Sequence, residues 1–344
     1  MKLVNRKLKT AVIILNWNGR DLLEEFLPVV IKHSDSDDCK VFVADNGSTD
    51  DSVDFVKQNF PGTPLIVFDE NYGFAEGYNK AINQVDAEYV VLLNSDVETT
   101  PGWIEELTLF MDSNDEVAAA QPKILSYKER DMFEYAGAAG GYIDWFGYPF
   151  CRGRILESVE KDTGQYDTVK PVFWATGASL FIRMRDYIDV GGLDGRFFAH
   201  MEEIDLCWRL NSRGRKVVCV PSSVVYHVGG ASLSKSNPKK MYLNFRNNLL
   251  MLYKNVPKRH IVATIIARFL FDFLAFLHLL FKGDFKSAVE VVRAYNDFYK
   301  MRASYKKIRK DNLRLTKVKS IPTQYKGSVL LRYYIGKKTF DSVL

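Results

Sequence analysis

Short apolar runs alternate with amphipathic stretches along the first hundred residues. Four runs rich in β-branched residues are strand candidates: residues 10–15, 40–44, 64–68 and 88–93. The stretches with helical periodicity are residues 19–33, 50–59 and 74–85. Strands that alternate with helices predict an α/β fold with a mostly parallel sheet. Ligands bind outside the carboxyl ends of such strands, so the polar residues after each run are the first candidates for a site.

The pattern changes in the second half of the chain. Residues 135–153 are rich in glycine and aromatic residues and predict an irregular loop with a hairpin. Residues 172–183 predict a strand or a strand pair, and 201–214 predict a helix after a loop at 191–200. Residues 216–221 and 224–230 predict strands or strand ends. From Met241 onward the pattern is helical.

Residues 261–281 form an apolar stretch about as long as the roughly 20 residues that span a bilayer. Arg268, Asp272 and His278 interrupt it, and the first two are four residues apart, where they can pair on one helix face. We therefore expect a helix that lies in the membrane interface rather than one that spans it. An ordinary helical pair packed on the preceding α/β domain is the alternative. Residues 286–310 add a basic amphipathic segment.

The net charge of +5 hides an asymmetry between two parts of the chain. Residues 1–234 carry a net charge of −13 and residues 235–344 one of +18. We expect a catalytic domain over 1–234 and a basic, mostly helical region over 235–344. The basic region suits the anionic cytoplasmic leaflet, whereas the acidic part would need a metal to hold a phosphate-bearing ligand. The sequence contains no recognised nucleic-acid motif, so we expect no nucleic-acid partner.

Cysteine usage and the N-terminus bear on the compartment. The four cysteines lack CxxC spacing, which favours a reducing environment. The first apolar run has five residues and is too short for the core of a signal peptide. We therefore expect a cytoplasmic protein, peripheral on the cytoplasmic face of the inner membrane.

Asn94, Ser95 and Asp96 follow the apolar run YVVLL. Asn94 and Asp96 are two positions apart, so they lie on the same face of an extended segment. A hard cation that bridges a diphosphate prefers oxygen ligands of this kind, and we expect Mg²⁺ or Mn²⁺ there. The alternative is an aspartate that only caps the following turn.

Three carboxylates lie within four residues at a predicted helix start: Glu202, Glu203 and Asp205. A helix N-terminus stabilises anions, so a solvated first turn is the simpler explanation. The preceding segment GRFFAH is aromatic, however, and apolar surroundings raise the pKa of a carboxyl group and make it a better base.

Other polar residues follow the remaining strands. Asp45 suits recognition of a ribose or base, although the turn after it could serve only to cap a helix. Asn71 and Gly73 begin a glycine-containing segment in which the backbone could approach a ligand, or simply turn tightly. His227 ends an apolar run and becomes a candidate metal ligand only if it lies beside Asp96.

Taken in order, these segments resemble family 2 glycosyltransferases of the GT-A fold, over residues 12 to about 248. The matching segments are VIILNWNG (12–19), VADNGSTDDS (43–52), NYGFAEGYNKAI (71–82), LLNSDVETTPGWIEEL (92–107), GASLFIR (177–183), GGLDGRFFAHMEEIDLCWRL (191–210), VPSSVVYHVGGAS (220–232) and FRNNLLMLYKN (245–255). Within the family the chain is similar to the rhamnosyltransferase-like branch, which builds bacterial surface polysaccharides.

The resemblance implies roles for individual residues. Those placed at the nucleotide sugar are Asn16, Trp17, Asp45, Asn71, Gly73, Asn94, Ser95, Gly177 and Arg246. Asp96 is implied as the metal-binding carboxylate of the family's DxD position, where Asn94 replaces the first aspartate. His227 aligns with a metal ligand of some relatives. The family's acid pair falls on Glu202 and Glu203; Glu203 replaces the usual aspartate base, and Glu202 stays an alternative.

These residues predict a single displacement with inversion at the anomeric carbon. A metal would neutralise the leaving nucleoside diphosphate, and Glu203 would deprotonate an acceptor hydroxyl. The expected donor is a dTDP-, UDP- or GDP-sugar, and the acceptor a glycan or lipid-linked molecule. A non-catalytic sugar-nucleotide-binding scaffold is the alternative, although it would have been free to lose Asp96 or the acid pair. The QxxRW motif of processive synthases and a GxGxxG after the first strand are both missing from the sequence.

Overall fold

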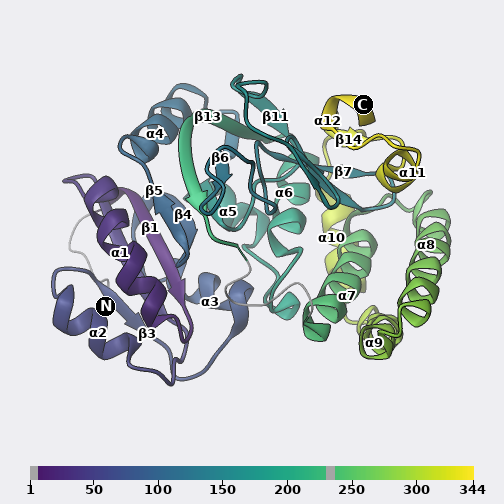
Figure 1. The fold of residues 1–344 in the computed structure, drawn as a ribbon, viewed down its shortest axis with the longest axis horizontal. Coiled ribbons are helices and arrows are strands. Elements are labelled where there is room, and N and C mark those ends of the chain that lie inside the picture. The colour runs from purple at the N-terminus through teal and green to yellow at the C-terminus, as the bar shows by residue number, and fades with distance from the viewer. Residues whose placement is uncertain (1–6, 230–236) are drawn as a thin grey trace.

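The computed structural model describes residues 7–229 and 237–344. The predicted domain boundary at residue 234 lies outside the described residues. One large sheet occupies the middle of the molecule, with helices on both of its faces (Figure 1).

The four candidate strands in the first hundred residues are confirmed. They are β1 (Leu8–Asn16), β2 (Cys39–Asp45), β3 (Leu65–Val67) and β4 (Ala87–Asn94). β1 pairs in parallel with both β2 and β4, and β2 pairs in parallel with β3. The carboxyl ends of these strands therefore meet at one edge of the sheet, which is where the predicted polar residues lie.

The sheet continues beyond β4 with strands of mixed direction. These are β12 (Ser179–Arg183), β6 (Val117–Ser126), β13 (Lys216–His227), β11 (Lys170–Val172) and β5 (Val97–Thr99). β12 is antiparallel to both β4 and β6, β6 and β13 are parallel, and β5 and β11 are antiparallel to β13. The two strands predicted at 216–221 and 224–230 are one strand, because an irregularity between Val220 and Val224 interrupts its register without ending it.

Side chains along β1 alternate between the two faces of the sheet, as a strand requires. Ala11 and Ile13 belong to one core cluster, and Val12 and Ile14 to the other. Helices α1 (Arg20–Ser34), α2 (Ser52–Asn59) and α4 (Trp103–Ser113) cover the second cluster. Helices α3 (Gly73–Ile82), α5 (Met184–Val190), α6 (Glu202–Ser212) and α7 (Pro238–Asn255) cover the first. The predicted helices over 19–33, 50–59, 74–85 and 201–214 are thus confirmed to within a few residues.

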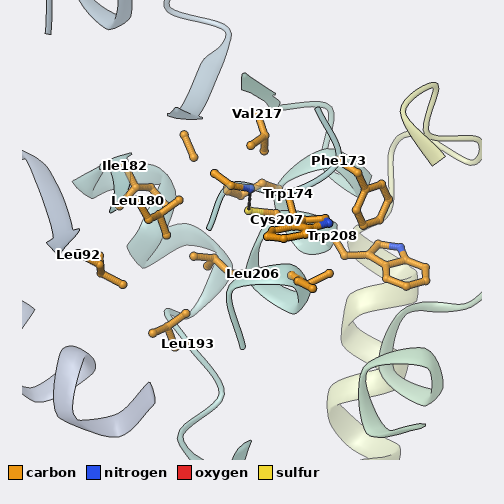
Figure 2. Close-up of a cluster of buried hydrophobic side chains, with 14 of the residues drawn as sticks. Leu92, Phe173, Trp174, Leu180, Ile182, Leu193, Leu206, Cys207, Trp208 and Val217 are labelled. Atoms are coloured by element: carbon orange, nitrogen blue, oxygen red, sulfur yellow. Dashed lines mark hydrogen bonds between the residues drawn. The ribbon is translucent and has the colours of Figure 1, made fainter. Parts of the chain in front are cut away.

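Helix α6 is fixed by its apolar side. Leu206 and Cys207 point toward Leu180, Ile182 and Val217 of the sheet (Figure 2). All are buried, and the backbone N–H of Ala175 donates to Sγ of Cys207 at 3.5 Å. The burial of several large apolar side chains holds the helix axis, so the position of its first residues is set by the core.

A small second sheet connects the two halves of the chain. Its strands are β7 (Gly141–Asp144), β8 (Pro149–Cys151), β9 (Arg154–Ile155), β10 (Ser158–Val159) and β14 (Gln324–Tyr325). β7 and β8 form the predicted hairpin, and β14 from the C-terminal region pairs in parallel with β7. The remaining helices are α8 (Ile261–Phe281), α9 (Phe285–Met301), α10 (Lys306–Leu315), α11 (Val329–Tyr334) and α12 (Phe340–Val343). α8 lies at the end of the molecule furthest from α1 and α2 (Figure 1).

Candidate active site

The carboxyl ends of β1 and β2 carry a hydrogen-bonded polar pair. Asn16 lies opposite Asp45 in the strand register. Nδ2 of Asn16 donates to Oδ2 of Asp45 at 3.1 Å, and the backbone N–H of Ser48 donates to Oδ1 at 2.9 Å. Both side chains are buried, so each conformation is fixed before any ligand binds.

Asn46, one of the polar residues at the end of β2, extends this pair toward α3. Its Nδ2 donates to Oδ1 of Asn71 at 3.1 Å and to the carbonyl of Gly73 at 3.0 Å. Oδ1 of Asn71 also accepts from the N–H of Gly73 at 2.8 Å. Gly73 has a φ of +76°, and a Cβ there would lie 2.5 Å from the ring of Phe198, so only glycine fits. We name the set Asn16, Asp45, Asn46, Asn71 and Gly73 the donor-side cluster.

Two further predicted residues lie around the donor-side cluster. Trp17 follows Asn16 and is 50% exposed, which leaves its indole face open to solvent. A Cβ built on Gly19 would lie 2.5 Å from Oδ1 of Asn16 and 3.7 Å from Oγ of Ser95. The ends of β1 and β4 therefore converge at Gly19. A hollow of about 450 Å³ opens nearby, lined by residues 18–22, 50 and 51.

The structure brings together Asn94 at the end of β4, Asp96 in the turn before β5, and His227 at the end of β13. His227 pairs with Val97 in the ladder between β13 and β5, so its side chain reaches Asp96. Nε2 of His227 lies 3.1 Å from Oδ1 of Asp96 and 3.3 Å from Nδ2 of Asn94. Burial alone would raise the pKa of Asp96, but its contact with His227 lowers it overall. For His227 burial acts in the opposite direction and lowers the pKa. Its two carboxylate neighbours outweigh burial and raise the pKa to about 10.

The second carboxylate beside His227 is Glu134, which the sequence analysis missed. Its Oε2 lies 3.3 Å from Nδ1 of His227 and accepts a short hydrogen bond from the backbone N–H of Ala136. We therefore describe this contact as an ion pair, because Nδ1 of His227 has no hydrogen-bond partner among the described residues. Glu134 lies in the loop that precedes β7, some 90 residues from His227, and no spacing in the sequence points to it.

Asp96 and His227 are spaced as adjacent ligands of one divalent cation, which would have to displace the proton that the raised pKa keeps on His227. Two ligands at about 2.1 Å from an ion, at right angles, are about 3 Å apart, and the observed separation is 3.1 Å. Among the residues that the structure describes, no group of three or more His, Cys, Asp or Glu side chains is arranged to hold a metal. Other ligands would therefore have to come from the donor and from water.

The segment before the acid pair has an unusual backbone. Phe198, His200 and Met201 have φ values of 67°, 71° and 73°. Non-glycine residues in this region are strained and concentrate at functional sites. The carbonyl of Phe198 accepts from the N–H groups of Phe74 and Ala75 at 2.6 and 3.1 Å. The strained segment therefore lies against the start of α3, next to the donor-side cluster.

Several side chains in and just after this segment have a buried polar atom without a hydrogen-bond partner among the described residues. Nε2 of His200 and Oε2 of both Glu202 and Glu203 are buried without a hydrogen-bond partner among the described residues. Burial and the neighbouring Glu203 raise the pKa of Glu202 well above its usual range, and burial raises the pKa of Glu203 to about 7. A carboxylate with such a pKa is matched to proton abstraction near neutral pH. We name Glu202 and Glu203 the acid pair.

Asp205, the third carboxylate of this turn, has a different environment. Its Oδ2 accepts from Lys254 at 2.7 Å and from Arg209 at 3.0 Å, and its Oδ1 accepts from Asn255 at 2.8 Å. The side chain is fully buried, so these contacts tie α6 to α7 and leave no oxygen for chemistry. Among the three acids, the structure leaves only the acid pair available.

Two other predicted residues, Arg246 and Gly177, contact the backbone or side chains around the site. The guanidinium of Arg246 is 9% exposed and donates to the carbonyls of Arg196 and Phe197 at 3.1 and 2.9 Å. Its donors thus support the strained segment. A Cβ on Gly177 would lie 2.9 Å from the ring of Phe74, and the next residue, Ala178, accepts from the N–H of Asn94 at 3.0 Å.

The sheet order and the polar residues at its carboxyl edge define a GT-A type α/β fold. This chain is similar to solved structures of glycosyltransferases. One is GalNAc-T7 with UDP, GalNAc and Mn²⁺, with a TM-score of 0.55 and 15% identity over 73% of this chain and 48% of that one. Another is the mannosyltransferase PcManGT from Pyrobaculum calidifontis in complex with GDP-Man and Mn²⁺, with a TM-score of 0.51 and 15% identity over 90% and 85%. The predicted fold class is confirmed.

Residues 11–159 match the model of glycosyl transferase family 2. The N-acetylglucosaminyl-diphospho-decaprenol L-rhamnosyltransferase of Mycobacterium tuberculosis is 27% identical over 70% of this chain and 83% of its own length. The rhamnosyltransferase WbbL of Escherichia coli is 24% identical over 63% and 82%. The predicted resemblance to family 2 and its rhamnosyltransferase-like branch is therefore confirmed.

Proposed function

We propose that this protein is an inverting glycosyltransferase that moves a sugar from a nucleotide-diphosphate sugar to a hydroxyl of a glycan or lipid-linked acceptor. The acid pair carries the proposal, because two neighbouring carboxyl groups, each with one buried oxygen that no described residue satisfies, lie beside a prearranged polar cluster at the carboxyl edge of the sheet. Keeping such groups costs stability, and a protein without catalysis would have no need of them.

The residues divide the reaction between them. The donor-side cluster and Trp17 would hold the nucleoside, with the indole as a stacking surface. Asp96 and His227 would hold a divalent cation, which when bound supplies positive charge to the leaving diphosphate. Glu134 would act as a positioning residue, because a carboxylate on the far nitrogen fixes the ring orientation of a metal-bound histidine.

Glu203 would take the proton from the acceptor hydroxyl. It is the more exposed of the acid pair, and its raised pKa suits a base that works near pH 7. One base and direct displacement at the anomeric carbon give inversion. The preferred donor is dTDP-rhamnose and the transferred sugar is rhamnose, since the two relatives above are named rhamnosyltransferases. The name of the mycobacterial relative supports a lipid-linked acceptor.

A donor screen tests this function. Purified protein with Mn²⁺ or Mg²⁺ is titrated with dTDP-, UDP- and GDP-sugars, and both binding and slow hydrolysis are followed with and without EDTA. We expect one donor to bind and to be hydrolysed only with metal. Folded protein that binds none of these donors would contradict the proposal, whereas binding of a donor without any turnover would favour the sugar-nucleotide-binding scaffold.

A further inference from the structure

The outer side of α8 is an apolar surface that the protein itself leaves uncovered. Seven large apolar side chains there are 47–89% exposed: Val262, Ile266, Phe269, Leu270, Phe273, Leu274 and Phe281. Successive members are one, three, four or seven positions apart, and these spacings place all seven on one side of the helix as a single stripe. Exposed apolar patches of this extent mark surfaces that contact something else. We name these seven residues the α8 stripe.

Two of the three residues that interrupt this segment in the sequence, Arg268 and Asp272, point inward, whereas His278 is exposed. Arg268 and Asp272 are 3% and 1% exposed, and they pair at 3.1 Å as predicted. The hydroxyls of Tyr148 and Tyr295 donate to the two carboxylate oxygens of Asp272 at 2.9 and 2.8 Å. The pair is thus neutralised against the β7–β8 hairpin and α9, and the α8 stripe contains no charged residue.

Positive charge flanks the stripe at both ends. Lys258 and Arg259 are exposed just before α8, and Lys282 and Lys286 just after it. The exposed face of α9 continues the same chemistry, with apolar side chains beside basic ones: Phe285, Val289, Val292, Tyr299, Arg293 and Lys300. An apolar strip framed by Lys and Arg complements an anionic lipid surface, whereas a second copy would bring like charges together.

We propose that the α8 stripe lies in the interface of an anionic bilayer, with α8 parallel to the membrane plane. α8 is long and apolar enough to cross a membrane by length and composition. Crossing would, however, pull Arg268 and Asp272 away from Tyr148 and Tyr295 and into hydrocarbon. Lying in the interface keeps the pair packed and places only the stripe among lipids.

This surface is connected to the acid pair through the turn of the β7–β8 hairpin. Tyr148 contacts α8, and the neighbouring carbonyl of Gly147 accepts from Nδ2 of Asn248 at 2.6 Å. The same Nδ2 lies 3.8 Å from Sδ of Met201, the residue before Glu202. A membrane-bound α8 would therefore hold the acid pair near the lipid surface. This consequence rests on the proposed function, whereas the membrane contact itself does not.

Binding to vesicles tests the surface without requiring catalysis. The full chain is sedimented with phosphatidylcholine vesicles that contain 0 or about 30% phosphatidylglycerol. We expect binding that requires the anionic lipid, and a tenfold or greater loss for Leu270→Glu/Leu274→Glu. These leucines are 58% and 62% exposed, so the fold should tolerate the change. The matched control, Leu109→Glu/Ile188→Glu, alters equally exposed residues of α4 and α5 and should bind like the parent.

Solution hydrolysis of the donor, measured on the same variants, separates the two proposals. If Leu270→Glu/Leu274→Glu loses vesicle binding but hydrolyses the donor like the parent, the result supports membrane binding through the α8 stripe. Vesicle binding with no donor turnover would leave the surface standing and count against the proposed function. Equal binding by both double variants would overturn the surface, as would a parent dimer that the stripe variant alone dissociates.

The depth to which α8 enters the bilayer is measured with an environment-sensitive dye. The four native cysteines are buried and free, so introduced cysteines can be labelled selectively. A dye at position 270 should shift to the blue on anionic vesicles, and a dye at exposed position 57 of α2 should not. Aqueous quenchers added inside the vesicles should leave the label at position 281 unaffected if α8 lies on the outer surface. Quenching from inside would show that α8 spans the bilayer and overturn the in-plane arrangement.

Discussion

The donor-side cluster and the acid pair lie next to each other but are built in opposite ways. In the cluster, Asn16, Asp45, Asn46 and Asn71 are joined by hydrogen bonds before any ligand is present, although Oδ1 of Asn16 is buried without a partner among the described residues. The acid pair lies on a strained segment with buried oxygens that no described residue satisfies. The first arrangement holds a binding surface rigid, and the second keeps carboxyl groups reactive. Binding and proton transfer therefore place different demands on neighbouring polar groups.

The largest test of this contrast is Glu203→Gln. Removing the base should lower kcat by about 10³-fold, because general base catalysis contributes roughly 10²–10⁴. Donor affinity should not change, since the donor-side cluster is intact. Steady-state kinetics and donor titration measure the two quantities. Glu202→Gln is the matched variant, and if it alone loses turnover, Glu202 is the base.

Asp96→Ala should have the next largest effect and should act on binding as well as turnover. Losing a metal ligand should lower kcat/KM by about 10²-fold. It should also weaken Mn²⁺ binding, which electron paramagnetic resonance measures without donor. Asp54→Ala removes an exposed carboxylate from α2 and should change neither quantity. Normal Mn²⁺ binding by the Asp96 variant would place the metal elsewhere.

The pH profile tests the acid pair without mutation. Because the pKa of Glu203 is raised to about 7, the base is increasingly protonated below that pH. With donor saturating, kcat should fall about tenfold per pH unit below 7 and level off above it. Stopped or continuous assays across pH 5 to 9 measure this. A profile that stays flat down to pH 5 would contradict the raised pKa.

Glu134→Gln should have a smaller effect that is confined to the metal. The variant keeps the size of the side chain but loses the charge beside Nδ1 of His227, so Mn²⁺ affinity should fall about tenfold. Glu134→Asp should recover part of it. The unfolding midpoint serves as control, because a residue with only a structural role would lower stability and leave metal affinity unchanged.

The sequence predicted the donor-side half of the molecule better than the rest, for a physical reason. Asn16, Asp45 and Asp96 each follow a buried strand, and strand ends converge in a parallel sheet. Glu134 belongs to a loop whose place depends on the second sheet, so no local pattern reveals it. β6 and α4 were not predicted either.

The orientation of α8 shows the same limit. Periodicity correctly predicted the pairing of Arg268 with Asp272. It could not show that Tyr148 and Tyr295, both distant in sequence, would cover that pair and turn the apolar side outward.

The smallest expected effect is a gain in stability. The pKa of Glu203 is about 7 in the folded protein against 4.5 for a free side chain, so the folded state binds more protons between these values. Stability from this group is therefore lost as pH rises from about 4.5 to 7, and the loss is complete above 7. Glu203→Gln cannot ionise and should be more stable than the parent at pH 7.5 by about 1 kcal/mol, after allowance for its partial exposure, and equal to it at pH 4.5. Urea unfolding at both pH values measures this, with Glu105→Gln on the exposed first turn of α4 as control. A variant less stable at both pH values would show that Glu203 stabilises the fold, and the contrast between the two clusters would then be wrong.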